Sequence, residues 1–331
     1  MLCCMLALLM SACVYEDEVP CPCKLRFVYD HNMEWADAFA SQVEKATLFI
    51  FDDQERFITT KTIDCKQLNN NTLDLQLAPG RYTLVAWATS GDAGCYQYEN
   101  AMKEGTSTLQ DLKLKLQCQA GEEDYGKNPA DLWHGMLKDF HVQANQPTSD
   151  TLRLLKNTNR IKVLLQSVDG SPVGMEDYSL AITDANHAYA HDNSVLPHLA
   201  TLTYRPYQTR EVTIDNSAAT PDAASRAEAD APATISAITA EMATLRLMAD
   251  RSPRFIVHNE RTGRDLFNIN LREYLDKMRL SEHANLPLQE FLDRENTWQV
   301  ILVMGQKNDG TKVMLSLQIN AWRIIFNDVS L

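Results

Sequence analysis

The stretch that decides the fold runs from residue 77 to residue 87 and reads Leu77-Ala78-Pro79-Gly80-Arg81-Tyr82-Thr83-Leu84-Val85-Ala86-Trp87. Pro followed by Gly predicts a turn, because Pro pre-sets the backbone for a turn and Gly tolerates the next position. After the turn, successive side chains of a strand point to opposite faces. Tyr82, Leu84 and Ala86 share one face, and Thr83, Val85 and Trp87 share the other. Both faces can be buried, which predicts a central strand of a β-sandwich.

Similar β-rich runs recur along the whole chain, and no regular helical spacer separates them. Leucines alternate with polar residues over 112–117. Over 160–165, Ile161, Val163 and Leu165 alternate with Arg160, Lys162 and Leu164. Both patterns are expected for strands with one buried face. Further runs cover residues 25–29, 46–51, 178–183, 243–248, 298–304 and 313–326. The pattern predicts antiparallel sandwiches rather than a parallel, doubly wound sheet. Helices are predicted only over 34–45 and 270–278, with Asn270 as the N-cap.

Length and charge narrow the class of protein. The 331 residues favour two domains, and the net charge is -13. Nucleic acid and anionic membrane surfaces are poor partners, because both need a cationic face. The prediction is a mainly β protein: two tandem antiparallel β-sandwich domains with a few short helices, an N-terminal domain at 24–156 and a C-terminal domain at 157–331.

The N-terminus predicts export. Residues 1–12 are uncharged and apolar, but far too short to span a bilayer as a helix. They end in Leu9-Met10-Ser11-Ala12-Cys13, which resembles the lipobox of bacterial lipoproteins. The resemblance implies that residues 1–12 are a signal peptide, that Cys13 carries lipid such as palmitate, and that the lipid holds the protein in the outer membrane. The alternative is an ordinary signal peptide with an unmodified Cys13.

Residues 13–23 would then form a lipidated acidic tether. Glu16, Asp17 and Glu18 resemble the export signal that sends some Gram-negative lipoproteins to the outer face of the membrane. The resemblance implies surface exposure. The alternative is that the three carboxylates only form a solvated, acidic tether.

Five cysteines remain once the signal peptide and Cys13 are set aside. In an oxidising compartment disulfides persist, and an odd number leaves one thiol free or paired with another chain. The pair in Cys21-Pro22-Cys23 could be half of a metal site, but no second clustered pair accompanies it. Disulfides are therefore predicted among these cysteines, and no metal or cofactor is predicted. The candidates are Cys21, Cys23, Cys65, Cys95 and Cys118.

No motif predicts catalysis. Residues 305–312 place Thr, not Lys, directly after the second Gly, and a strand follows, so they are read as a hairpin turn and not as a phosphate-binding loop. His187 and His191 are four residues apart, yet the residues around them are typical of a loop. A nucleophile elbow of the form G-x-S-x-G is absent from the sequence. The protein is predicted not to be an enzyme.

A series of short motifs lies at 25–30, 32–33, 36–39, 46–52, 77–87, 132–135, 159–163, 291–294 and 319–323. Each motif alone is weak, but in this order they resemble the FimB-like family of fimbrial anchor lipoproteins in the fimbrillin superfamily, which builds type V pili. They span nearly the whole mature chain. The resemblance implies transthyretin-like sandwiches, pilins of the fimbrial shaft as partners, and a role that holds the pilus base at the outer membrane by β-strand addition.

The C-terminal run is the candidate pilin-contact strand. Trp322, Ile324 and Phe326 share one face, and Val329 and Leu331 follow. A terminal strand can be exchanged without breaking a loop at either end, and an open sheet edge supplies unpaired backbone groups. Two alternatives stay open: the run completes the core of its own domain, or a groove near residues 25–29 makes the joint. A second function, glycan binding or adhesion on the same fold, would require exposed aromatic side chains around one concave face.

Overall fold

The structure, a computed structural model, describes residues 21–118, 123–168, 170–215 and 234–326. These residues form five sheets, one of six strands, two of five and two of three, together with three short α-helices, so the mainly β prediction is confirmed. The helices are α1 (Phe39–Gln42), α2 (Leu271–Glu282) and α3 (Leu288–Arg294).

The N-terminal half is a sandwich of a three-stranded sheet, β10-β1-β4, and a five-stranded sheet, β11-β9-β5-β2-β3. Buried residues from both sheets form one apolar core. The strands are β1 (Cys21–Val28), β2 (Lys45–Phe51), β3 (Phe57–Asp64), β4 (Thr72–Leu77), β5 (Gly80–Thr89), β9 (Leu132–Val142), β10 (Thr148–Arg153) and β11 (Leu155–Lys156).

Strand β5 is the central strand that the opening stretch predicts. Leu84 and Ala86 face the core between the two sheets of the N-terminal half. Val85 and Trp87 face the opposite way, into a second core that continues into the C-terminal half. All four side chains are buried, so both predicted faces are confirmed.

The C-terminal half is a second sandwich, of the six-stranded sheet β16-β17-β12-β20-β21-β22 and the five-stranded sheet β19-β18-β13-β15-β8. Alternating residues such as Ile161, Val163 and Leu165 of β12 are buried as predicted. The strands are β8 (Asp124–Tyr125), β12 (Thr158–Ser167), β13 (Tyr178–Asp184), β15 (Leu202–Tyr204), β16 (Gln208–Asp215), β17 (Thr234–Leu245), β18 (Arg254–Asn259), β19 (Arg264–Asn270), β20 (Thr297–Gln306), β21 (Lys312–Ile319) and β22 (Trp322–Ile325).

The two halves share secondary structure as well as a core. A small sheet joins β6 (Tyr96–Tyr98) and β7 (Lys113–Leu116) to β14 (Ala188–Ala190). Strand β8 pairs with β15 of the C-terminal half. Strand β8, which precedes residue 157, is therefore part of a C-terminal sheet, and β6 and β7 share a sheet with the C-terminal half. The division at 156/157 stays a prediction.

Two features of the fold differ from the prediction. The helix predicted over 34–45 is limited to α1, because Trp35 has a φ of +55°, a left-handed conformation that a helix does not allow. The sheets are not purely antiparallel: β1 pairs with β10, β12 with β20, and β15 with β8 in parallel. Each parallel pair joins segments far apart in sequence, which leaves enough chain for a crossover. The second predicted helix is present as α2, with Asn270 at its N-cap position.

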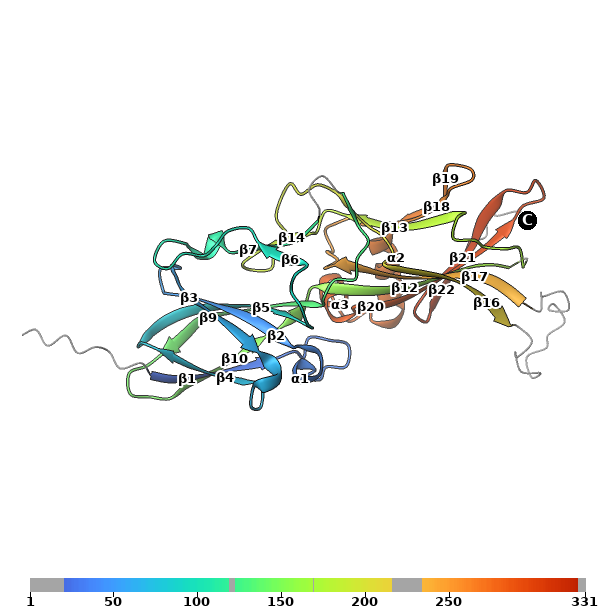
Figure 1. The fold of residues 1–331 in the computed structure, drawn as a ribbon. Coiled ribbons are helices and arrows are strands. Elements are labelled where there is room, and N and C mark those ends of the chain that lie inside the picture. Colours follow the sequence, from blue (N-terminus) through green and yellow to red (C-terminus); the bar gives the residue numbers. More distant parts are fainter. Residues whose placement is uncertain (1–20, 119–122, 169, 216–233, 327–331) are drawn as a thin grey trace, which may run out of the picture.

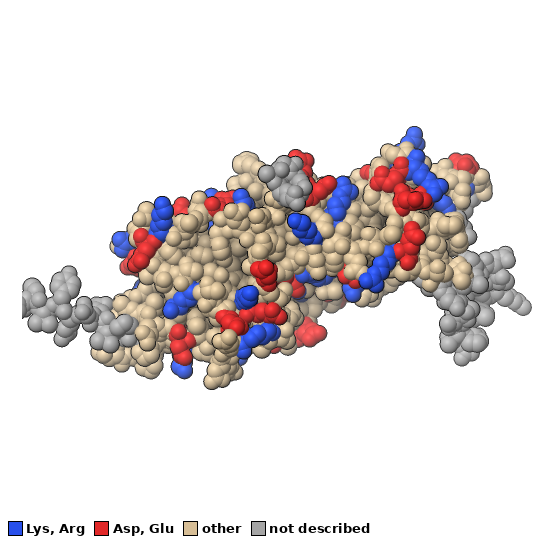
Figure 2. All heavy atoms as spheres, in the orientation of Figure 1, with Lys and Arg blue, Asp and Glu red and all other residues tan. Residues whose placement is uncertain are grey.

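The molecule is elongated, with β1 beginning at one end and the β20–β22 sheet reaching toward the other (Figure 1). No helix among the described residues is long and apolar enough to cross a membrane. Figure 2 shows Lys and Arg side chains interspersed with Asp and Glu on the face drawn, without a continuous basic patch there.

Candidate functional site

The predicted C-terminal contact strand lies at the edge of the large sheet. Among the described residues β22 pairs only with β21, as the last of six strands. Trp322 and Phe326 are half-buried and pack against the large core, and the Phe326 ring meets Phe267 edge-on at a centroid distance of 5.9 Å. Arg323 and Ile325 face the opposite way, and Ile325 is 63% exposed.

The backbone of β22 has one hydrogen-bonding side that β21 does not use. The Phe326 N–H donates to the Leu315 carbonyl at 2.8 Å. Because antiparallel partners alternate between hydrogen-bonded and non-hydrogen-bonded pairs, the amides of Arg323 and Ile325 point away from β21. Unpaired backbone amides along a strand edge are a template onto which another strand can pair.

Strand β1, near which the alternative groove was expected, is not an edge. It is the middle strand of its sheet, paired with β10 on one side and β4 on the other. Leu25 and Phe27 are fully buried. The edges of this sheet belong to β10 and β4.

Several predicted site residues lie outside the described part of the chain: Cys13, Glu16, Asp17, Glu18, Val329 and Leu331. The cysteine side chains that the structure describes form no disulfide with one another, so the predicted pairing is not shown. Cys23 and Cys65 are buried and Cys95 and Cys118 are half-buried; the side chain of Cys21 also lies outside the description.

A buried ionic cluster joins the two halves where β9, β11 and β12 meet. Asp131 Oδ2 lies 2.9 Å from Lys156 Nζ, and Asp131 Oδ1 lies 2.7 Å from Arg160 Nη2. Burial alone would raise the pKa of the Asp131 carboxyl, but the two cations outweigh it and the pKa lies below its ordinary value. The Lys156 ammonium also lies over the Trp133 ring, 5.2 Å from its centroid.

Helix α3 makes a second connection between the halves. Asp293 accepts two hydrogen bonds from Arg246, each 2.7 Å long, and both side chains are almost fully buried. The next residue, Arg294, points to the N-terminal half: its Nη1 donates to the carbonyls of Asp30 and Asn32 at 3.4 and 3.3 Å. Adjacent residues of one short helix therefore hold opposite halves of the molecule.

Aromatic and amide side chains complete this domain junction. Tyr29 meets Trp133 edge-on at 5.8 Å and accepts a hydrogen bond from Asn296 Nδ2 at 3.2 Å. Trp298 Nε1 donates to Asn159 Oδ1 at 3.0 Å. Of these contacts, the Tyr29–Asn296 hydrogen bond crosses between the two halves, close in sequence to the Arg294 contacts that do the same.

Sequence reasoning did not identify the domain junction as a site. Asp131, Lys156 and Arg246 have no local signature, because their partners lie in other segments of the chain. Within the described residues, no group of three His, Cys, Asp or Glu side chains could hold a metal ion.

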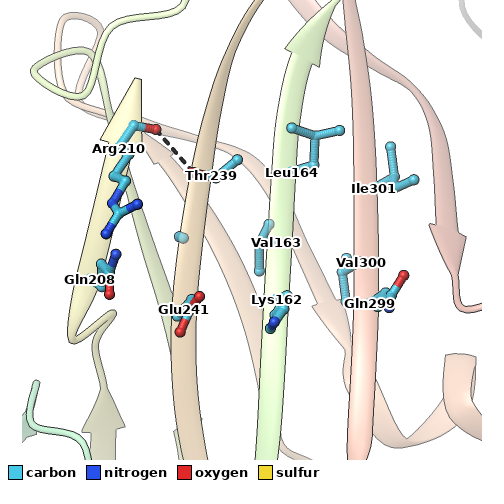
Figure 3. Close-up of a pocket in the computed structure, with 11 residues that line it drawn as sticks. Lys162, Val163, Leu164, Gln208, Arg210, Thr239, Glu241, Gln299, Val300 and Ile301 are labelled. Carbon is cyan, nitrogen blue, oxygen red and sulfur yellow. Dashed lines mark hydrogen bonds between the residues drawn. The ribbon is translucent and has the colours of Figure 1, made fainter. Parts of the chain in front are cut away.

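A shallow hollow of about 450 Å³ lies on the outer face of the six-stranded sheet (Figure 3). Gln208, Glu241, Lys162 and Gln299 lie directly opposite one another across β16, β17, β12 and β20. Leu164 and Ile301 form the neighbouring apolar row. None of the 11 lining residues is aromatic.

Comparison with solved structures finds the same fold over nearly the whole chain. A candidate polysaccharide-binding protein from Bacteroides thetaiotaomicron is 29% identical, with a TM-score of 0.74, 93% of this chain and 99% of that chain covered. A candidate adhesin from the same species is 28% identical, with a TM-score of 0.75 and coverages of 94% and 100%. The fimbrial anchor protein Mfa2 from Porphyromonas gingivalis shares the fold at 20% identity, with a TM-score of 0.67 and coverages of 92% and 99%.

A search of curated proteins finds no match. A family model described as "Fimbrillin-A associated anchor proteins Mfa1 and Mfa2" matches residues 16–328. This match includes both sandwiches, the domain junction and β22. The chain therefore belongs to the Mfa2 family of fimbrillin-A associated anchor proteins.

Proposed function

We propose that the protein anchors a fimbrium to the outer membrane. Lipid on Cys13 holds the chain in the membrane, and the acidic run 16–18 directs it to the outer face. At the other end, β22 pairs with a strand of a fimbrial shaft subunit. The protein acts by holding and positioning its partner and not by catalysis.

The observation that carries this proposal is the placement of β22. It is the edge strand of the largest sheet, and that sheet reaches toward the end of the molecule opposite the start of β1 (Figure 1). A chain tethered before β1 would present this edge away from the membrane. The ion pairs of the domain junction, Asp131 with Lys156 and Arg160 and Asp293 with Arg246, would keep the two sandwiches in a fixed orientation when the fimbrium is pulled.

Strand addition at β22 fits both its backbone and its side chains. The outward amides of Arg323 and Ile325 offer two backbone donors to an added strand. Trp322 and Phe326 are only half-buried at the open side of the core, so a further strand would cover apolar surface that is now partly exposed.

Glycan binding is less well supported. A sugar-binding face on this fold would require exposed aromatic rings. The hollow on the outer face of the six-stranded sheet is lined by polar and aliphatic side chains and by no aromatic ring. Trp35, a strongly exposed aromatic side chain, lies in a separate loop and has the Arg294 guanidinium over its ring at 3.4 Å.

The test replaces one outward amide without touching the β21 pairing. Ile325→Pro removes the N–H that faces away from β21, and Pro is tolerated on edge strands. Ile325→Ala removes the same side chain but keeps the amide, so it is the matched control. Loss of one net hydrogen bond of about 1 kcal/mol should weaken binding of the shaft subunit by about fivefold in the Pro variant relative to the Ala variant. Equal affinity of the two variants, with unchanged thermal unfolding, would argue against strand addition at β22.

A further inference from the structure

Strand β22 presents two unlike side chains on the outer face of the six-stranded sheet. Arg323 and Ile325 are exposed there, whereas the residues that alternate with them are half-buried. Among the large apolar side chains of the described residues, Ile325 is the most exposed, at 63%. Both residues also direct their amides away from β21, so a strand added at this edge would lie directly beside them.

The positive charge of Arg323 is not balanced by the neighbouring strand. Arg323 belongs to none of the ion pairs that the described residues form. Its neighbour on β21 is Gln318, a neutral side chain whose Nε2 donates to the Asn320 carbonyl at 2.9 Å. The opposite side of β22 is the open edge. A strand added at this edge can therefore supply the counter-charge.

The apolar surface of Ile325 is covered from one side only. Its neighbour on β21 is Ser316, a small and buried side chain, and Val303 of β20 follows in the same cross-strand row. Ser316 is too small to cover the Ile325 side chain, which stays exposed toward the open edge. An aliphatic side chain at the opposite position of an added strand would remove this surface from water.

Strand geometry decides which residues of an added strand reach these two side chains. Directly opposite residues on neighbouring strands point to the same face of a sheet, with Cβ atoms about 4.5 to 5.5 Å apart. A carboxylate opposite Arg323 is therefore within reach of the guanidinium. The residue between the two outer positions points to the other face, toward the half-buried Trp322 and Phe326.

We propose that the strand added by the shaft subunit carries three successive residues of defined chemistry. An acidic residue lies opposite Arg323, an apolar residue points toward the core, and an aliphatic residue lies opposite Ile325. The order along the partner chain depends on whether the added strand runs parallel or antiparallel to β22. This inference rests on the proposed function, strand addition at β22, and specifies the partner that this edge selects.

The two outer positions supply specificity that the backbone does not. Backbone hydrogen bonds are the same for every sequence, so side chains decide which strand an edge accepts. A Lys or Arg opposite Arg323 would place like charges together, which destabilises a cross-strand pair. The edge therefore discriminates among strands that all present an apolar face to the core.

The first test measures binding of shaft protein, sheared from fimbriae of the same cells, to the full chain. At 50 mM NaCl, Arg323→Gln should bind about threefold and Arg323→Glu about tenfold more weakly than wild type, while Arg323→Lys binds like wild type. These differences should shrink at 500 mM NaCl, because salt screens exposed charges. Arg210→Gln is the matched control: Arg210 lies in the same cross-strand row on the far edge strand β16, so its loss should not alter binding.

The second test identifies the acidic residue of the partner. A carbodiimide joins a lysine amine to a carboxylate in contact with it. In the complex of Arg323→Lys, mass spectrometry should map a cross-link from position 323 to an Asp or Glu that precedes or follows an apolar residue of the shaft subunit. Arg210→Lys should give no cross-link to that carboxylate.

The third test concerns the aliphatic position. Ile325→Val and Ile325→Thr have the same β-branched shape, but Thr replaces a methyl group with a hydroxyl. We expect Ile325→Val to bind shaft protein like wild type and Ile325→Thr to bind about threefold more weakly.

The outcomes separate this inference from the proposed function. Equal binding of Ile325→Pro and Ile325→Ala would overturn strand addition, and the strand pattern with it. If those two variants differ, the pattern alone is overturned by any of three results: Arg323→Glu binds as tightly as wild type, Ile325→Thr binds as tightly as Ile325→Val, or position 323 cross-links to no carboxylate of the shaft subunit.

Discussion

Replacing Asp131 with Asn should strongly destabilise the protein, because it leaves two buried cations without their shared anion. The Lys156 side chain is 6% exposed, Asp131 18% and Arg160 23%. Removing one partner of a buried ion pair costs about 3 to 5 kcal/mol. Since Asp131 and Arg160 keep some contact with water, we expect about 3 kcal/mol, the lower end of this range.

The double variant Asp131→Asn with Lys156→Met tests the cause. Met is close to Lys in length and removes one of the two stranded charges, so it should recover part of the lost stability. The two substitutions should therefore be non-additive by about 1 kcal/mol or more. Urea unfolding followed by tryptophan fluorescence measures each free energy of unfolding.

The pH dependence gives an independent check. The pKa of Asp131 is lowered in the folded protein, so its contribution to stability is present above the unfolded pKa, near 3.9, and is lost as pH falls through the folded pKa. The difference between wild type and Asp131→Asn should stay constant from pH 5 to 8 and shrink below about pH 4. A loss below about 0.5 kcal/mol at pH 7 would refute the reasoning, since that is the range of a solvent-exposed pair.

Three further predictions concern the membrane end and the core. Cys13→Ala should move the protein from the membrane fraction to the soluble fraction, and continued membrane retention would contradict lipid anchoring. Replacing the acidic run 16–18 with Ala should keep the lipid but protect the protein from protease added to whole cells; unchanged cleavage would show that the run is only a tether. Gly135→Ala should lower the free energy of unfolding by about 1 to 3 kcal/mol, because an added Cβ would lie 2.3 Å from Leu152 Cδ2 and 2.7 Å from the Arg153 carbonyl oxygen. An unchanged thermal unfolding midpoint would contradict this packing.

Much of the fold could be predicted from period-two patterns. The two faces of β5 and the buried residues of β12 follow from alternation, because a strand places neighbouring residues on opposite faces. The prediction of a helix over 34–45 was wrong outside α1, Phe39–Gln42. Apolar spacing there did not reveal the left-handed turn at Trp35, or that Asp37 Oδ1 accepts hydrogen bonds from the Tyr29 and Phe39 amides.

The domain junction could not be predicted for a different reason. Asp131 and Arg160, like Arg246 and Asp293, are brought together only by the packing of two sandwiches. The parallel pairing of β12 with β20 also depends on that packing. The position of β22 at a sheet edge agrees with the expectation from the sequence, but which of its amides face outward required the β21 register.

Amide hydrogen exchange of β22, with and without the fimbrial shaft subunit, tests the proposed joint most directly. Strand addition predicts that the Arg323 and Ile325 amides, which face away from β21, exchange more slowly in the complex, while the edge strand β3 of the N-terminal half is unchanged. Unaltered exchange at both amides in a complex that has formed would contradict the proposal that β22 holds the fimbrium.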